Sequence, residues 1–89
     1  MYKPNEHEGR LSAMASDFTA MRKKQIGEFV RSRRESKGLS RRELGEMIGY
    51  DKGADVYIGS FERGRTYIPP EKIRLVKEAL GCEYEDLIP

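Results

Sequence analysis

The hydrophobic residues of the chain recur three and four positions apart, the spacing that places side chains on one face of an α-helix. Met14, Phe18 and Met21 follow this spacing and predict a helix over about residues 11–24, with Ser12 or Ser16 as its cap. The ten residues before it combine a proline and a glycine with polar side chains. We therefore expect the chain to begin with a loose tail.

A second amphipathic segment follows directly. Ile26, Phe29 and Val30 lie on one helical stripe. The stripe predicts a helix that ends near Gly38, because glycine readily adopts the left-handed backbone found just past a helix end.

Two short helices are expected next. Ser40 and Glu43 have the spacing of a capping box, in which each side chain binds the other residue's backbone N–H at a helix start. They predict a helix of about nine residues, too short to be stable without tertiary packing. Ile58 and Phe61 then form the inner face of a further helix over about residues 54–63.

The last part of the chain predicts one more helix and a closing turn. Pro70 suits a first helical turn, where its missing N–H costs nothing, and Ile73, Val76 and Leu80 form the inner face. Residues 83–88 can form a short terminal turn. Four to six short helices without an alternating strand pattern predict an all-α fold.

The length and composition limit the classes of protein. The 89 residues fit one small domain, or one domain with an arm. We expect a tail and possible extra helix over 1–22 and the folded domain over 23–89. No apolar run approaches the roughly 18–20 residues of a membrane span. The first residues lack the order of a secretory signal. These features predict a cytoplasmic protein that does not bind a membrane.

Candidate chemistry for catalysis is sparse. The single cysteine, Cys82, excludes an intrachain disulfide framework and a cysteine-rich zinc site. The single histidine, His7, lies in the expected tail. Catalytic triads, phosphate-binding loops and HExxH motifs are missing from the sequence. We expect no enzymatic activity, no catalytic or metal-binding residue and no cofactor.

The charge is unevenly distributed along the chain. The formal net charge is +2, yet residues 22–42 contain nine Lys and Arg side chains against Glu28 and Glu35, a net charge of +7. A basic face that could bind a polyanion is one interpretation, and the solvated surface of a helix is the other.

The two short helices have a feature that suggests nucleic-acid recognition. Gly45 lies in the first of them, and two helices that cross steeply need a very small residue where they touch. This arrangement is typical of a helix-turn-helix, in which the second helix enters the major groove of DNA. A small helical bundle would share these features, so spacing alone leaves both interpretations open.

Four segments in fixed order narrow this choice: RESKGLS (34–40), ELGEMIG (43–49), Ile58-x-x-Phe61-Glu62-Arg63-Gly64-Arg65 followed by Pro69, and ALGCEYEDLI (79–88). Together they resemble the Cro/repressor-type helix-turn-helix family, also called the XRE family, of bacterial and phage regulators. The resemblance runs from Ile26 to Ile88. It implies a lambda-repressor-like bundle of about five helices that binds a double-stranded DNA operator as a homodimer and acts as a transcriptional repressor.

The resemblance also implies roles for residues at matching positions. Arg34 and Glu62 would form an ion pair that ties the first helix to the recognition helix. Phosphate contacts would fall to Ser40, Arg41, Arg42, Arg63, Arg65 and Thr66. Base readout would fall to Asp55, Val56, Tyr57 and Ser60, with Gly59 allowing close approach. Asp55 could equally cap the recognition helix.

Two parts of the chain depart from the family pattern. The turn before the recognition helix is about three residues longer than usual, which leaves the helix start open, and Lys52 on it could reach a phosphate or a base. Residues 1–25 have no counterpart in the family core. They could pack as a simple extension, form a dimerisation helix, or bind a partner protein, as in an antitoxin built on the same fold.

Overall fold

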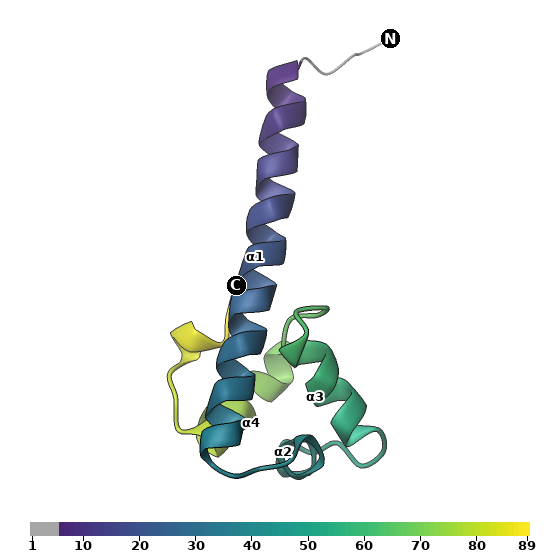
Figure 1. The fold of residues 1–89 in the computed structure, drawn as a ribbon, viewed down its shortest axis with the longest axis vertical. Helices are drawn as coiled ribbons and strands as arrows, with labels where there is room; N and C mark the ends of the chain where they lie inside the picture. Colours follow the sequence, from purple (N-terminus) through teal and green to yellow (C-terminus); the bar gives the residue numbers. More distant parts are fainter. Residues whose placement is uncertain (1–5) are drawn as a thin grey trace.

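The computed structural model describes the backbone of residues 6–89 and the side chains of residues 17–89. The elements are α1 (Glu6–Ser36), α2 (Arg41–Met47), α3 (Ala54–Glu62), α4 (Pro70–Leu80) and a short 3-10 helix, η1 (Tyr84–Asp86). All five elements of the described chain are helical, which confirms the predicted all-α class (Figure 1). Within residues 6–89, no helix is both long and apolar enough to span a membrane.

The first helix is longer than the sequence predicted. α1 is one continuous helix of 31 residues, where we expected a tail to residue 10 and then two separate helical segments. Its start at Glu6 lies before Ser12 and Ser16, so the prediction that one of them caps the helix is wrong. The predicted boundary between the N-terminal segment (1–22) and the folded domain (23–89) falls inside α1. This division of the chain stays a prediction. The side chain of Met14, predicted to share a face with Phe18, lies outside the described side chains.

One interior glycine of α1 marks the place where another helix packs against it. A Cβ atom at Gly27 would lie 2.6 Å from the carbonyl oxygen of Glu62, at the end of α3. Glycine at this position costs about 1 kcal/mol of helix propensity relative to alanine. Its presence is explained by the close approach of the two backbones.

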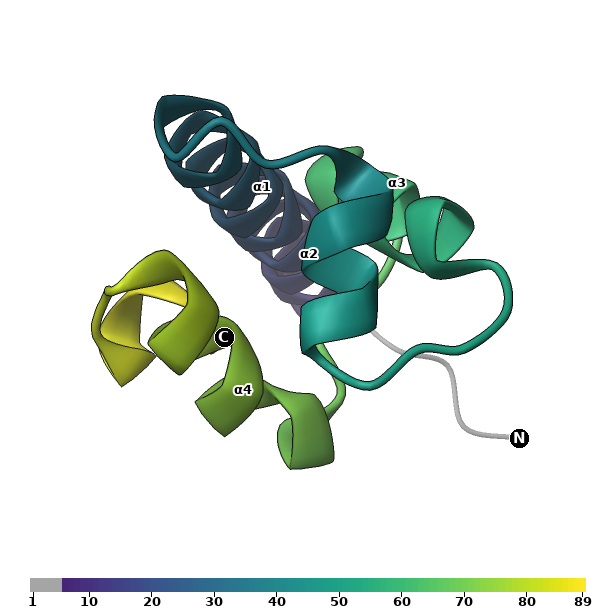
Figure 2. The same ribbon diagram turned by 90° about the horizontal axis from the view of Figure 1, so that it is seen from below.

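The helices share one hydrophobic core. Figure 2 shows α2 between α3 and α4, with α1 beside them. Buried core side chains come from every α-helix and from the segments that follow α3 and α4: Ile26, Val30, Leu44, Ile48, Ile58, Phe61, Ile68, Val76, Leu80 and Leu87. The stripes predicted around Ile26, Ile58 and Val76 therefore do face the core. The stripe predicted from Phe18 and Met21 does not, because both side chains are exposed. Each fully buried large side chain contributes about 1.5–3 kcal/mol to folding.

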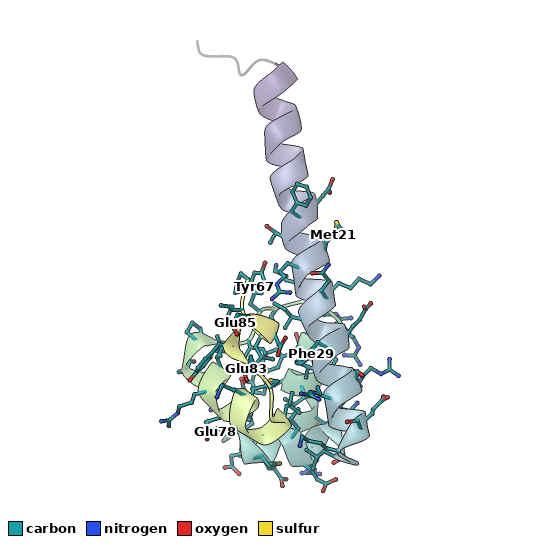
Figure 3. All side chains as sticks on the ribbon, turned by 90° about the vertical axis from the view of Figure 1, so that its left-hand side faces the viewer. Met21, Phe29, Tyr67, Glu78, Glu83 and Glu85 are labelled. Carbon is teal, nitrogen blue, oxygen red and sulfur yellow. The ribbon has the colours of Figure 1, made fainter. Side chains whose placement is uncertain are left out.

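The two halves of α1 differ in their surroundings. The C-terminal half packs against the other helices, whereas the N-terminal half extends beyond them (Figure 1). Phe18 is 62% exposed and Met21 is 55% exposed. Met21 lies on the side of α1 turned away from the other helices (Figure 3). This part of α1 therefore offers an apolar surface to solvent.

The C-terminal segment is fixed to the middle of α1. Arg22 donates hydrogen bonds from Nε to the carbonyl oxygen of Ile88 at 2.9 Å and from Nη2 to that of Glu85 at 2.6 Å. Cys82, between α4 and η1, is buried, and this burial raises the pKa of its thiol.

Candidate nucleic-acid interface

The geometry around Gly45 shows how closely α2 and α3 approach. A Cβ atom at Gly45 would lie 2.6 Å from the Cβ atom of Ala54 and 2.7 Å from its carbonyl oxygen. Real Cβ contacts do not become this short, so a larger residue would force the two helices apart. The two helices cross in contact at Gly45, as the sequence predicted.

The start of α2 has the expected capping box. Ser40 Oγ accepts a hydrogen bond from the Glu43 backbone N–H at 3.0 Å, and the Glu43 carboxylate accepts one from the Ser40 backbone N–H at 3.0 Å. The bond from the Ser40 backbone lowers the pKa of the Glu43 carboxyl group. This pair fixes where α2 begins and therefore how it meets α3.

The structure shows where α3, the helix predicted to read bases, begins. Gly53 is the N-cap residue, with a left-handed backbone at φ 68°, and α3 begins at Ala54, as predicted. Asp55 is therefore not the cap but lies in the first turn, where a carboxylate interacts favourably with the helix dipole.

α3 has an outer side that is open to solvent. Asp55 is exposed, Val56 is 67% exposed and Tyr57 is 48% exposed, while Ser60 is half-buried. These four residues are those predicted to read bases, and the structure places them away from the core. The inner side carries the buried residues Ile58 and Phe61.

Gly59 does not have the predicted environment. It is buried, and a Cβ atom there would lie 3.1 Å from Arg63 Nη1 and 3.7 Å from Arg41 Nη1. The absence of a side chain therefore makes room for two guanidinium groups rather than for a close approach of DNA to the helix backbone.

Glu62, at the end of α3, is the one charged side chain in the described core. It is 1% exposed and accepts hydrogen bonds from Arg34 Nε at 2.6 Å and Arg34 Nη2 at 3.0 Å. Arg34 Nη1 also donates to the Leu39 carbonyl oxygen at 2.8 Å. The bond to Glu62 raises the pKa of Arg34. The ion pair implied by the family resemblance is thus present in the structure, where it joins α1 to α3.

Arg41 is a second partner of Glu62, which sequence reasoning missed. Its Nε donates to Glu62 Oε1 at 3.1 Å, and 35% of its side chain is exposed. Arg41 therefore joins α2 to the same carboxylate, in addition to any contact with a phosphate. The spacing of Arg41 and Glu62 along the sequence gave no signal for this bond.

The remaining residues predicted to contact phosphates are all exposed: Ser40, Arg42, Lys52, Arg63, Arg65 and Thr66. Arg42 also forms a solvent-exposed ion pair with Glu46 at 3.3 Å. Lys52 precedes α3, whereas Arg63 and Arg65 follow it. Exposed cations therefore lie near both ends of the helix predicted to read bases.

An aromatic pair beside α3 was not predicted. Tyr50, in the long loop, stacks on Tyr57 with ring centroids 4.1 Å apart and ring planes inclined by 8°. Lys72 of α4 places Nζ 4.7 Å from the centroid of the Tyr50 ring and donates to the Ile48 carbonyl oxygen at 2.9 Å. Burial raises the pKa of the Tyr50 hydroxyl. Tyr50 and Tyr57 lie in different elements, so no periodic pattern links them.

A hollow of about 350 Å³ opens beside this stack, and we call it the α3 groove. Its lining residues are Tyr50, Val56, Tyr57, Ser60, Phe61, Thr66, Tyr67 and Pro69. It contains three of the four predicted readout residues. Ser60 Oγ and Thr66 Oγ1 are 3.2 Å apart and share a hydrogen bond.

The basic block of residues 22–42 does not form one free surface. Four of its arginines are in ion pairs with carboxylates of the described chain: Arg31, Arg34, Arg41 and Arg42. Arg22 and Arg33 donate to backbone carbonyl oxygens. Of the ion pairs, those of Arg34 and Arg41 join different helices, whereas Arg31 and Arg42 each pair with a carboxylate of their own helix. Among the described residues, no group of three or more His, Cys, Asp or Glu is placed to hold a metal ion.

These elements define a helix-turn-helix unit, and comparison with known proteins agrees. A family model described as helix-turn-helix matches residues 30–87, about two thirds of the chain. The chain therefore belongs to the Cro/repressor-type (XRE) helix-turn-helix family of DNA-binding transcriptional regulators, as the resemblance implied. This is a family of regulators rather than of enzymes. No curated protein and no solved structure matches the chain.

Proposed function

We propose that the protein is a cytoplasmic transcriptional repressor that inserts α3 into the major groove of a specific DNA operator. The observation that supports this most is that Asp55, Val56 and Tyr57 are exposed, whereas Ile58 and Phe61 of the same helix are buried. A recognition helix needs one side fixed in the core and the other free to reach base edges. Each outer residue has its own chemistry: Asp55 can accept from cytosine N4, and Val56 can contact a thymine methyl group.

The cations around α3 support a role in phosphate binding. Lys52, Arg63 and Arg65 are exposed near the two ends of the helix. Each phosphate neutralised by such a side chain releases counterions, and the slope of log affinity against log salt concentration is about −0.9 per phosphate. We expect these contacts to set the orientation on DNA, while the outer side of α3 sets the sequence.

Selection of bound sites from random duplex DNA with the whole chain tests this function. We expect one two-fold symmetric site, bound at least about 10³-fold more tightly than unrelated DNA. A reconstituted transcription reaction with this site across a promoter should lose its transcript when the protein is added. Absence of any binding to duplex DNA at about 50 mM salt would contradict the proposal.

We further propose that the protein binds its operator as a homodimer. One helix-turn-helix domain contacts few base pairs, so two half-sites one helical turn apart are the usual route to specificity. Phe18 and Met21 offer an exposed apolar surface on α1 for a protein contact. The same surface also favours the second candidate function, an antitoxin-like module whose N-terminal segment binds a partner protein.

Sedimentation of the chain with and without operator DNA separates these two functions. Two copies on one operator, with no other protein added, support the homodimer. The variant Phe18→Ser/Met21→Ser should then weaken pairing if α1 contributes to it, whereas Met47→Ser, also exposed but on α2, serves as the control. Operator binding that requires an added protein would favour the antitoxin-like module instead.

A further inference from the structure

We propose that Tyr50 positions Tyr57 so that the α3 groove binds the 5-methyl group of a pyrimidine in the operator. Such a methyl group belongs to thymine or to 5-methylcytosine. The inference rests on the proposed function, because the groove can meet a base only if α3 enters the major groove. It goes further in two ways: it names the chemical group that is read, and it names Tyr50 as a residue that acts by positioning Tyr57.

The first support is the series of contacts that fixes the Tyr57 ring. An exposed tyrosine on a helix normally samples several rotamers. Tyr57 instead lies almost parallel to Tyr50, with centroids 4.1 Å apart. Stacked aromatic rings at such distances attract each other beyond the effect of buried area alone.

Tyr50 is itself held from the side of the domain core. Its ring lies 6.5 Å from that of Phe61, and Lys72 Nζ lies 4.7 Å from its centroid. The hydrogen bond from Lys72 to the Ile48 carbonyl oxygen fixes the ammonium group, which favours a cation–π contact. Lys72, Tyr50 and Tyr57 thus form a continuous series of contacts from α4 to the outer side of α3.

The second support is the chemistry of the groove next to this ring. Val56, Tyr57 and the ring of Tyr67 contribute mainly carbon to its walls. The hydroxyl groups of Ser60 and Thr66 share a hydrogen bond, so they partly satisfy each other. A carbon-lined wall binds an apolar group better than a hydrogen-bonding edge.

The major groove of DNA offers one such apolar group. The edges of the four bases present donors and acceptors there, and the 5-methyl group of thymine is the exception. Burial of one methyl group is worth about a 3- to 5-fold change in affinity. A groove with a volume of about 350 Å³ can admit the methyl group together with the edge of its base.

Tyr50 belongs to the loop that departs from the common family spacing. The ring on which Tyr57 rests therefore lies in the segment whose length departs from that spacing. We infer that the longer loop contributes to specificity by supplying the ring on which Tyr57 rests.

The test uses the duplex obtained by selection from random DNA, in which each thymine is replaced in turn by deoxyuridine, which lacks only the methyl group. For the native chain we expect one position, or two symmetric ones, where this replacement weakens binding about 3- to 5-fold. Tyr50→Ala should reduce that ratio to below about 1.5-fold while leaving the salt slope unchanged. Tyr50→Phe keeps the stacked ring and should retain the ratio.

A second variant keeps the test decisive if Tyr50→Ala does not fold. Lys72→Met keeps an unbranched side chain of similar length but removes the cation over Tyr50. It should lower the ratio of thymine to deoxyuridine affinity by a smaller amount than Tyr50→Ala. A C·G pair with and without the 5-methyl group at the sensitive position identifies the source of the methyl group: tighter binding of 5-methylcytosine than of thymine indicates a modified base.

Two results would overturn the inference. One is a selected operator in which neither the loss of a thymine methyl group nor the addition of a 5-methyl group to a cytosine changes the affinity. The other is a ratio that persists in folded Tyr50→Ala. Failure to select any operator is a different result, since it would contradict the proposed function itself.

Discussion

The two sides of α3 are built from the same nine residues and serve different purposes. On the inner side, Ile58 and Phe61 are buried in the core and Glu62 binds arginines from α1 and α2. On the outer side, Val56 and Tyr57 remain largely exposed. The difference teaches that the inner side sets where the helix lies, whereas the outer side is free to determine what it recognises.

The largest expected effect is the loss of Glu62. Glu62→Gln removes the carboxylate that neutralises Arg34, whose side chain is only 11% exposed. Among the described residues, the Arg34 charge then keeps only the exposed carboxylate of Glu35, 3.8 Å away. We expect the free energy of unfolding to fall by about 3–5 kcal/mol, measured by urea denaturation. Glu46→Gln, which breaks the exposed pair with Arg42, should cost less than about 1 kcal/mol. Equal losses of unfolding free energy in the two variants would show that Glu62 does not hold α3 in place.

A smaller loss is expected where α2 meets α3. In Gly45→Ala the new Cβ atom would lie 2.6 Å from that of Ala54. The clash should outweigh the gain of about 1 kcal/mol in helix propensity and leave a net loss of about 1–3 kcal/mol. Met47→Ala, at an exposed position of the same helix, should change stability little. A Gly45→Ala protein as stable as the native chain would mean that the crossing tolerates a wider separation.

Substitution of an exposed cation just after α3 should weaken DNA binding without affecting folding. We expect Arg65→Ala to weaken binding to all sequences about equally and to lower the salt slope by about 1. Its free energy of unfolding should stay within about 0.5 kcal/mol of the native value. Arg74→Ala, an exposed arginine of α4, is the control for loss of one positive charge. An unchanged salt slope for Arg65→Ala would show that Arg65 does not contact a phosphate.

The smallest effect concerns the cap of α2, which lies on neither side of α3. The hydrogen bonds of Glu43 lower its pKa in the folded state, so their contribution to stability is complete above the unfolded pKa of about 4.3 and is lost as the pH falls through the lower folded value. The difference in stability between the native chain and Glu43→Gln should therefore narrow in acid. Urea denaturation across pH 2–7 measures it, and a difference that widened in acid would refute the assignment.

The inner side of α3 could largely be predicted from the sequence. Ile58 and Phe61 are three residues apart and mark the buried stripe, and Gly45 marks the crossing because only glycine fits there. The capping box at Ser40 and Glu43 is equally local, since its residues are separated by a single turn. Such features are encoded within a few neighbouring residues, so periodicity and spacing detect them.

Several contacts of α3, on both of its sides, are carried by no local pattern. Tyr50 reaches Tyr57 across a loop, and Arg41 reaches Glu62 across two elements. Gly59 suggested open space for DNA, but the structure fills the position with arginine side chains. The continuity of α1 was also missed, and the approach of α3 to Gly27 is a contact that periodicity along α1 does not show.

The thiol of Cys82 can report how often the structure around it opens. The sequence contains no other cysteine, and this thiol is 6% exposed with a pKa that burial raises. Reaction with a maleimide therefore has to wait until the corner between α4 and η1 opens, and the labelling rate records how often it does so. Mass spectrometry of the native sequence can follow this rate, free or on DNA, without any engineered label.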